Sequence, residues 1–83
     1  MSIAEIILRV LRKDKEKTRE QIRKILRKLK KNDDVLIVWD TLIRFQKQRF
    51  VVENMKTKPF RYLLTDEGLE RQRKITKDIK ARP

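Results

Sequence analysis

Hydrophobic residues recur every three or four positions near the start of the chain, which predicts an amphipathic helix from about Ile3 to Lys13. The apolar face of this helix consists of Ile3, Ile6, Ile7, Val10 and Leu11. After a charged break, Thr18 and Gln21 have the spacing of a capping box, which predicts the start of a second helix. Basic side chains surround its apolar stripe, which consists of Ile22, Ile25, Leu26 and Leu29.

The stretch from Asn32 to Gln48 allows two interpretations. Its apolar run from Val35 to Trp39 is rich in β-branched residues, as in a buried strand. A helix is favoured, because Asn32 to Asp34 supply N-cap candidates and apolar residues continue at helical spacing. The residues expected to face the core are Val35, Val38, Trp39 and Leu42. Those expected to face outward are Ile37, Asp40, Thr41, Arg44, Lys47 and Gln48.

Two strand-like runs follow, from Phe50 to Met55 and from Phe60 to Leu64, and they predict an antiparallel hairpin with a basic tip. The period then changes to that of a helix at Thr65, an N-cap candidate followed by two acidic residues. This last helix is expected to reach about Lys80, with residues 81–83 frayed. The residues on its inner face are Leu69, Gln72, Ile75, Thr76 and Ile79.

The composition argues against an enzyme. The 83 residues, expected to form a single domain, include no cysteine, no histidine and one glycine. The chain therefore lacks the thiolate and imidazole groups that most often act in catalysis or bind zinc, and it has no glycine-rich phosphate loop. Asp33, Asp34 and Asp40 suggest a metal site, but capping and surface roles explain them with fewer assumptions. No cofactor or small-molecule ligand is expected.

The charge points to a polyanionic partner. Lys and Arg number 24 against 12 Asp and Glu, which gives a formal net charge of +12. Such a field attracts polyanions over about 10 Å at ordinary salt. Heat adaptation also explains a high content of charged residues, and a thermostable protein is expected, but it does not explain an excess of one sign. No run resembles a signal peptide or is long enough to span a membrane, so a cytoplasmic protein is expected.

The expected order of helix, helix, helix, hairpin and helix, with "YLLTDEG" at the strand-to-helix junction, resembles winged helix-turn-helix regulators. The resemblance is to MarR-like and PadR-like proteins, including small relatives in archaea and archaeal viruses, where the cytoplasm would be that of the host. In them the second wing strand commonly ends in Tyr-x-Leu-Thr-x-x-Gly, which Tyr62, Leu64, Thr65 and Gly68 match. The resemblance covers about residues 3–80 and implies an α+β fold with three helices, a two-stranded wing and a C-terminal helix. Family members often carry a glycine after the third helix, where this chain has "QKQRF" and needs another helix terminator.

The resemblance implies a transcriptional regulator that binds double-stranded DNA with its third helix in the major groove. The residues that could meet base edges are Ile37, Thr41, Arg44, Lys47 and Gln48. Those expected on the phosphate backbone are Arg19, Arg23, Lys24, Arg27, Lys30, Lys31, Lys56, Lys58 and Arg61. The acidic start of the third helix favours backbone attraction over base readout. It also leaves open a protein-interaction module, and charge alone leaves RNA binding open.

Two further expectations concern aromatic and aliphatic residues. Trp39 is expected in the core, although an exposed tryptophan could stack on a base, and Phe60 and Tyr62 are expected on the packed face of the wing. The terminal helices carry more aliphatic surface than a small monomer readily hides. Because MarR-like and PadR-like proteins typically pair through these helices, a homodimer is expected, with an interface at Ile3, Ile7, Ile75 and Ile79.

Overall fold

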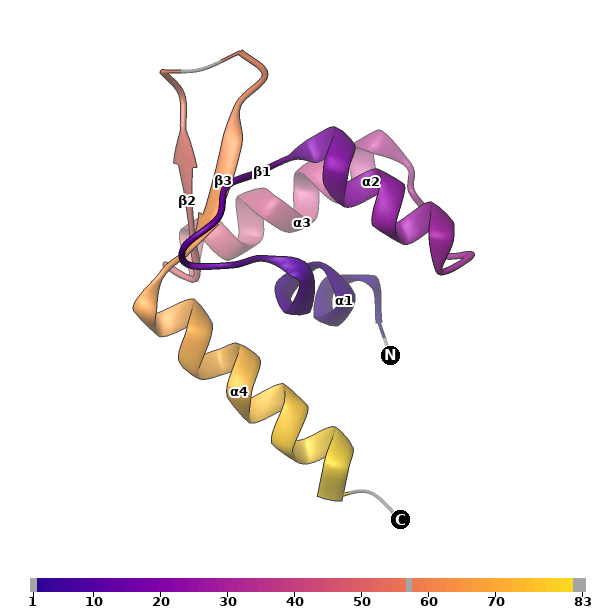
Figure 1. The fold of residues 1–83 in the computed structure, drawn as a ribbon, viewed down its shortest axis with the longest axis vertical. Coiled ribbons are helices and arrows are strands. Elements are labelled where there is room, and N and C mark those ends of the chain that lie inside the picture. The colour runs from indigo at the N-terminus through magenta and orange to yellow at the C-terminus, as the bar shows by residue number, and fades with distance from the viewer. Residues whose placement is uncertain (1, 57, 82–83) are drawn as a thin grey trace.

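A computed structural model describes residues 2–56 and 58–81 of the chain. The elements run in the order α1 (Ile3–Val10), β1 (Lys17–Thr18), α2 (Arg19–Lys28), α3 (Val35–Lys47), β2 (Val51–Asn54), β3 (Arg61–Leu64) and α4 (Asp66–Ala81). The first three helices form a compact group, the β2–β3 hairpin rises above them, and α4 extends from the opposite end (Figure 1). The described residues thus form an α+β fold, as expected.

The two helices nearest the N-terminus begin at side-chain caps. The Ser2 hydroxyl accepts a hydrogen bond from the Glu5 amide at 3.2 Å, and the predicted capping box of α2 is present between Thr18 and Gln21. However, α1 ends at Val10 and not near Lys13, since Leu11 has an extended backbone while its side chain stays buried in the core. The burial of Ile6, Ile7 and Leu11 was predicted correctly, but the prediction missed the buried Leu8 and made the helix too long.

The hairpin is part of a three-stranded antiparallel sheet with the order β1-β3-β2. Val51 pairs with Leu64 and Asn54 with Arg61, so the hairpin has the predicted direction. The prediction missed β1, whose two residues pair with Tyr62 and Arg61 of β3. A strand this short has no apolar alternation of its own, and only its pairing with β3 defines it.

The stretch from Val35 to Lys47 is a helix, which rules out the buried-strand interpretation. The Asp34 carboxylate caps it by accepting from the Leu36 amide at 2.8 Å. Of the predicted inward face, Val38 and Leu42 are buried, but Val35 and Trp39 are wrong, because they are 47% and 46% exposed. The residues of α3 that enter the core are Val38, Leu42 and Phe45. The start of α3 is apolar almost all round, so packing against α1 and α2 decides which stripe is buried.

The helix α3 ends without a glycine. Arg49 takes up the left-handed backbone conformation, with φ of 63°, and the Phe50 amide donates to the Phe45 carbonyl at 2.8 Å. This is a Schellman motif, in which glycine is the usual residue. The end of α2 repeats it, with Lys30 at φ of 55° and the Lys31 amide donating to the Leu26 carbonyl.

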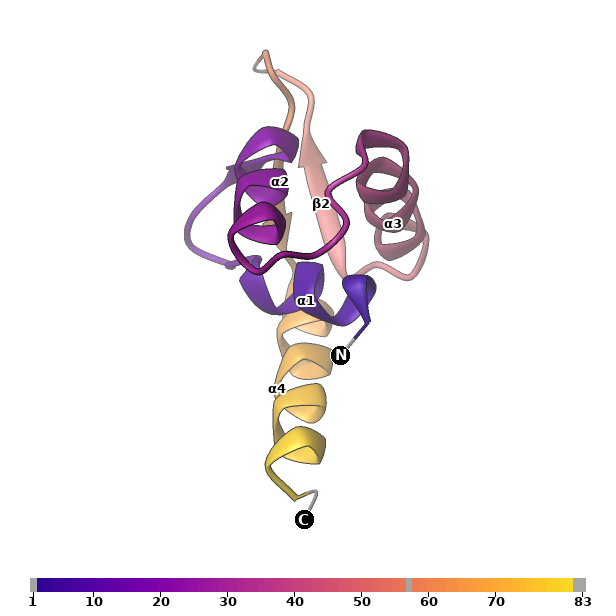
Figure 2. The ribbon, with the colours of Figure 1, turned by 90° about the vertical axis from the view of Figure 1, so that its right-hand side faces the viewer.

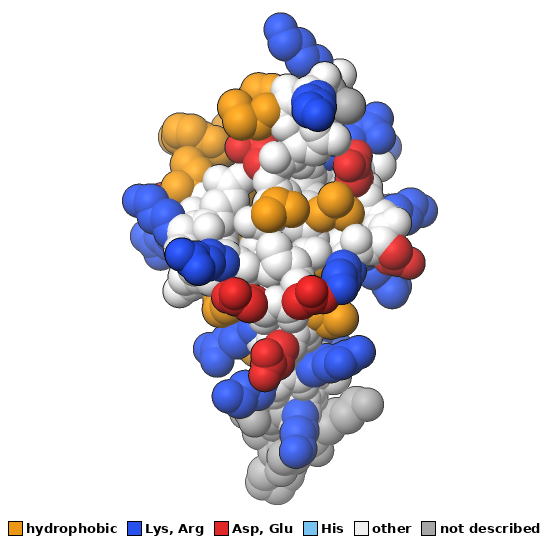
Figure 3. Space-filling model, turned by 90° about the vertical axis from the view of Figure 1, so that its left-hand side faces the viewer, with side chains coloured by type: hydrophobic (Ala, Val, Ile, Leu, Met, Phe, Trp, Pro, Cys, Tyr) orange, Lys and Arg blue, Asp and Glu red, His pale blue; other side chains and the backbone are white. Residues whose placement is uncertain are grey.

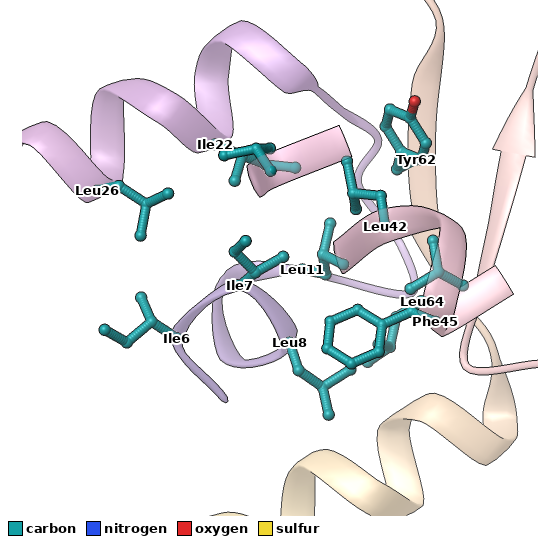
Figure 4. Packing of buried hydrophobic residues seen from close by; sticks show 12 residues of the cluster. Ile6, Ile7, Leu8, Leu11, Ile22, Leu26, Leu42, Phe45, Tyr62 and Leu64 are labelled. Carbon is teal, nitrogen blue, oxygen red and sulfur yellow. The ribbon is translucent and has the colours of Figure 1, made fainter. Parts of the chain in front are cut away.

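The core joins α1, α2, α3 and the sheet (Figure 4). Its fully buried side chains include Ile7, Leu11, Ile22, Leu42 and Tyr62. Tyr62 thus packs inward as predicted, and Phe60 is half-buried. The Tyr62 hydroxyl donates to the Glu53 carboxylate at 2.9 Å, and the Gln46 amide of α3 donates to the same carboxylate at 3.2 Å. These bonds fix β2 and β3 against α3.

The "YLLTDEG" junction ties the hairpin to α4. The Thr65 hydroxyl accepts from the Gly68 amide at 3.0 Å, which confirms the predicted cap, and it donates to the Arg49 carbonyl at 2.6 Å. One threonine therefore caps α4 and also holds the turn that ends α3. The helix α4 includes Ala81, which was predicted to be frayed, and residues 82 and 83 of the predicted frayed tail lie outside the described part of the structure.

Candidate nucleic-acid interface

Two helices stand on either side of β2, with α2 and α3 joined by a short turn (Figure 2). Asp33 in this turn binds Arg27 of α2, with 2.9 Å between the guanidinium Nη2 and the carboxylate Oδ2. Arg23 donates to the Asp33 carbonyl at 2.7 Å. The hydrogen bond from Arg27 holds the pKa of Asp33 below its usual value. Two arginines expected on the phosphate backbone therefore already hold the turn between α2 and α3.

Other basic side chains from that set are free to bind a polyanion. Within residues 2–56 and 58–81, no ion pair involves Lys24, Lys30, Lys31, Lys56 or Lys58, all of which are exposed. They occupy two places, α2 with its C-terminal turn and the hairpin tip. Basic side chains at the hairpin tip stand out at the top of Figure 3. Arg61 lies at a loose 3.9 Å from Glu16. Arg19 is half-buried near Tyr62, where its charge acts on the phenol.

Two of the residues expected to contact base edges already have partners within α3. Arg44 pairs with Asp40 at 3.1 Å, and the Thr41 hydroxyl donates to the Ile37 carbonyl within the helix at 2.8 Å. Lys47 is exposed, and so is Ile37. Gln48 instead lines a groove of about 240 Å³ between α1, the end of α3 and α4. Gln48, one turn after Arg44, thus borders this groove at the end of α3.

An exposed apolar surface lies between α3 and the hairpin, and the sequence analysis did not identify it. We call it the α3–hairpin surface, and it consists of Val35, Leu36, Trp39 and Met55. Leu36 is 67% exposed and Met55 65% exposed. Figure 3 shows hydrophobic side chains gathered beside the hairpin, toward the edge of the face on which α3 lies. The signal was the apolar run at the start of α3, which is too long for one buried stripe.

The two parts of this surface lie on neighbouring elements. Glu53 bonds Gln46 of α3, so this side of β2 faces α3. Met55 begins the turn that follows β2. On α3, Trp39 lies seven residues, or about two turns, before Gln46. The helix and the hairpin that carry Trp39 and Met55 therefore pack side by side.

Of the residues expected at a dimer interface, one is inaccessible to a partner in the part of the chain that the structure describes. Ile7 is fully buried in the core, which corrects its assignment to an interface. Ile3 and Ile75 are half-buried against the core, and the side chain of Ile79 lies outside the described part of the structure. The Gln72 amide instead joins the terminal helices, since it donates to the Leu8 carbonyl at 2.8 Å and the Leu11 carbonyl at 3.0 Å. Gln72 thereby supplies a hydrogen-bond donor to carbonyl groups at the end of α1 that have no partner within the helix.

Comparisons with known proteins add no identification. The sequence matches no family model, and the searches of curated proteins and of solved structures found no match. Among the described residues, no three acidic side chains gather into a group able to hold a metal ion. In the same residues, no helix is both long enough and apolar enough to cross a membrane.

Proposed function

We propose that this chain is a winged helix-turn-helix protein that binds double-stranded DNA and acts as a transcriptional regulator. The fold supports this, because α2, its turn and α3 are followed by a hairpin that stands beside α3, and a third strand completes the sheet. The observation that carries the proposal is the placement of exposed lysines without ion pairs on the two elements that neighbour α3. Lys30 and Lys31 follow α2, which precedes α3, and Lys56 and Lys58 lie at the tip of the hairpin that follows α3.

Binding of this kind is dominated by phosphate contacts. Lysines at the end of α2 and at the hairpin tip neutralise phosphates on either side of the groove that receives α3. Arg44 joins them by leaving Asp40, since an exposed ion pair contributes only about 0–1 kcal/mol. Because the outward face of α3 offers few hydrogen-bond donors, the proposed binding depends weakly on sequence.

A homodimer is part of this proposal. Ile3 and Ile75 lie on the two helices at the end of the molecule opposite the hairpin, where α4 extends beyond the body (Figures 1 and 2). Symmetric pairing there places two α3 helices about 34 Å apart, one turn of DNA, and suits a palindromic site. Sedimentation should then give twice the mass of one chain, whereas a monomer at micromolar concentration would remove this part of the proposal.

A protein partner is the second candidate function, and the α3–hairpin surface favours it. Exposed tryptophan, leucine and methionine side chains are typical of protein interfaces, and an acidic partner would suit the net charge of +12. The two candidates differ in their response to salt, because a protein contact through apolar groups does not release the counterions of a duplex.

The experiment is fluorescence anisotropy of a labelled random duplex, titrated with the protein at several salt concentrations. Five to seven phosphate contacts predict a log–log slope of roughly −4.5 to −6.3 against salt. A single-stranded RNA of equal length serves as competitor. Steep salt dependence with weak competition by the RNA supports the proposal. Absence of duplex binding at low salt would refute it, and stronger binding to the RNA would point to RNA as the partner.

A further inference from the structure

The single tryptophan of the chain presents an open indole ring to solvent. Trp39 is 46% exposed at the middle of α3, and the described part of the structure records neither a hydrogen bond nor a ring contact for it. The one aromatic pair among the described residues is Phe45 with Phe50, on the core side of the helix. The indole of Trp39 is thus left for a ligand with a flat apolar face.

The indole ring of Trp39 is part of the exposed apolar α3–hairpin surface. Val35 and Leu36 lie one turn before Trp39 on α3. Met55, which is also exposed, lies in the turn of the neighbouring hairpin. Basic residues lie on the neighbouring elements. Lys56 and Lys58 follow Met55 at the hairpin tip, and Arg19 at the start of α2 lies close to Tyr62. A flat apolar platform between basic groups is how proteins bind nucleic-acid strands whose bases are unpaired.

We propose that Trp39 is a stacking platform for unpaired bases, so that the protein prefers DNA with a locally opened segment over fully paired DNA. This inference rests on the proposed DNA binding. In a duplex the flat faces of the bases are covered by their neighbours, whereas an opened segment exposes them. The free lysines hold the phosphates, and the α3–hairpin surface receives the bases. Leu36 and Met55 supply apolar contact beside the indole.

The charge of the chain decides against the other occupants of this surface. Two copies that met through this surface would bring together two hairpin tips that carry lysines, whereas pairing through the terminal helices keeps these tips apart. A partner must therefore be strongly negative, and it must also present apolar faces to Trp39. Unpaired DNA combines both properties in every nucleotide. An acidic protein is the competing occupant, which the experiment separates from DNA.

The experiment compares two labelled DNAs of one sequence, the first fully paired and the second with a central run of mismatched thymines. Stacking on one base is worth about a 5- to 150-fold gain in affinity, so the opened DNA should bind at least about fivefold tighter. The fluorescence of the sole tryptophan should be quenched by the opened DNA and much less by the duplex. Poly-glutamate, a polyanion without bases, serves as the control ligand.

Three variants make the test specific. Trp39→Leu should lose the preference for opened DNA while its affinity for the duplex stays within about twofold, and Trp39→Phe should keep part of the preference because a ring remains. Leu29→Ala is the matched control, since Leu29 is 52% exposed but lies in a groove between α1 and the end of α2. It should keep the full preference. Far-ultraviolet circular dichroism verifies that each variant is folded.

The outcomes separate this inference from the proposed function. Duplex binding with equal affinity for both DNAs would overturn the inference and leave the proposed function standing. Quenching by poly-glutamate equal to that by opened DNA would also overturn it, because an acidic chain would then be a sufficient ligand. Absence of binding to either DNA would refute the proposed function itself.

Discussion

The carbonyl oxygen of Phe50 lies 2.1 Å from the point where a β-carbon on Gly68 would stand. Gly68 is therefore required for close packing of α4 against the turn that precedes β2, and not for an unusual backbone angle. The same carbonyl accepts a hydrogen bond from the Thr65 amide at 2.9 Å, and this bond restricts its movement away from Gly68. This explains in physical terms why a glycine follows the threonine in the sequence "LLTDEG".

Gly68→Ala should therefore destabilise the protein by about 1–3 kcal/mol, as overpacking does in a tight core. In an ordinary helix the same change stabilises by roughly 0.5–1 kcal/mol, so even the sign is diagnostic. Urea unfolding followed by circular dichroism measures the effect. Glu70→Ala, at an exposed position in the next half-turn of α4, is the control and should stay within about 0.5 kcal/mol. A stabilised Gly68→Ala variant would contradict the packing described.

Arg49→Gly should stabilise the protein by about 1 kcal/mol. Arg49 has φ of 63°, where a side chain is strained and glycine is not, and its backbone contacts survive the change. Gln48→Gly provides the contrast. Gln48 has φ of −83°, so glycine there only adds freedom to the unfolded chain and should cost about 1 kcal/mol. Equal effects at the two positions, measured by thermal and urea unfolding, would argue against the left-handed cap.

Tyr62 links pH to stability. Its burial, together with the hydrogen bond to Glu53, raises the pKa of Tyr62 from 10.0 to about 12. Between these values the unfolded chain releases the phenol proton while the folded chain keeps it. The stabilising contribution is therefore complete below pH 10.0 and is lost as the pH rises toward about 12. Because Tyr62 is the only tyrosine, the rise of phenolate absorbance reports this group alone.

Tyr62→Phe should flatten the loss of stability above pH 10.0 and lower the stability at neutral pH by about 1 kcal/mol, since one hydrogen bond to Glu53 disappears. The Gln46 amide still donates to that carboxylate, which keeps the effect moderate. Urea unfolding at pH 7 and at pH 11 measures both effects. A phenolate midpoint at the ordinary value in the native protein would contradict the burial of this hydroxyl.

Features set by neighbouring residues could be predicted from the sequence. The capping box at Thr18 and the cap at Thr65 act within four residues, so their spacing alone locates the starts of α2 and α4. The helical nature of α3 follows in the same way from the Asp34 cap. In contrast, β1 exists only through pairing with β3, more than 40 residues later in the chain, and no local pattern marks it.

The candidate site was less predictable for the same reason. Trp39 was assigned to the core because the apolar run of α3 offers several possible inward faces, and only packing with α1 and α2 selects Val38 and Leu42. The arginines of α2 could be identified as basic and outward, but their bonds to Asp33 depend on how the turn folds back. Exposed charge can be predicted from composition, whereas pairing between charges requires the fold.

The position of the free lysines, and not the total charge, should control duplex binding. Lys31→Gln combined with Lys56→Gln removes one lysine from the turn after α2 and one from the hairpin tip, and lowers the formal net charge from +12 by two, to +10. If both lysines contact phosphate, the magnitude of the log–log salt slope should fall by about 1.8. Lys74→Gln combined with Lys77→Gln gives the same net charge from exposed positions on α4 and should leave the slope nearly unchanged. Anisotropy titrations with one duplex measure both variants. If both pairs of substitutions reduced the salt slope equally, the overall field would attract the DNA. The lysines after α2 and at the hairpin tip would then make no specific phosphate contacts.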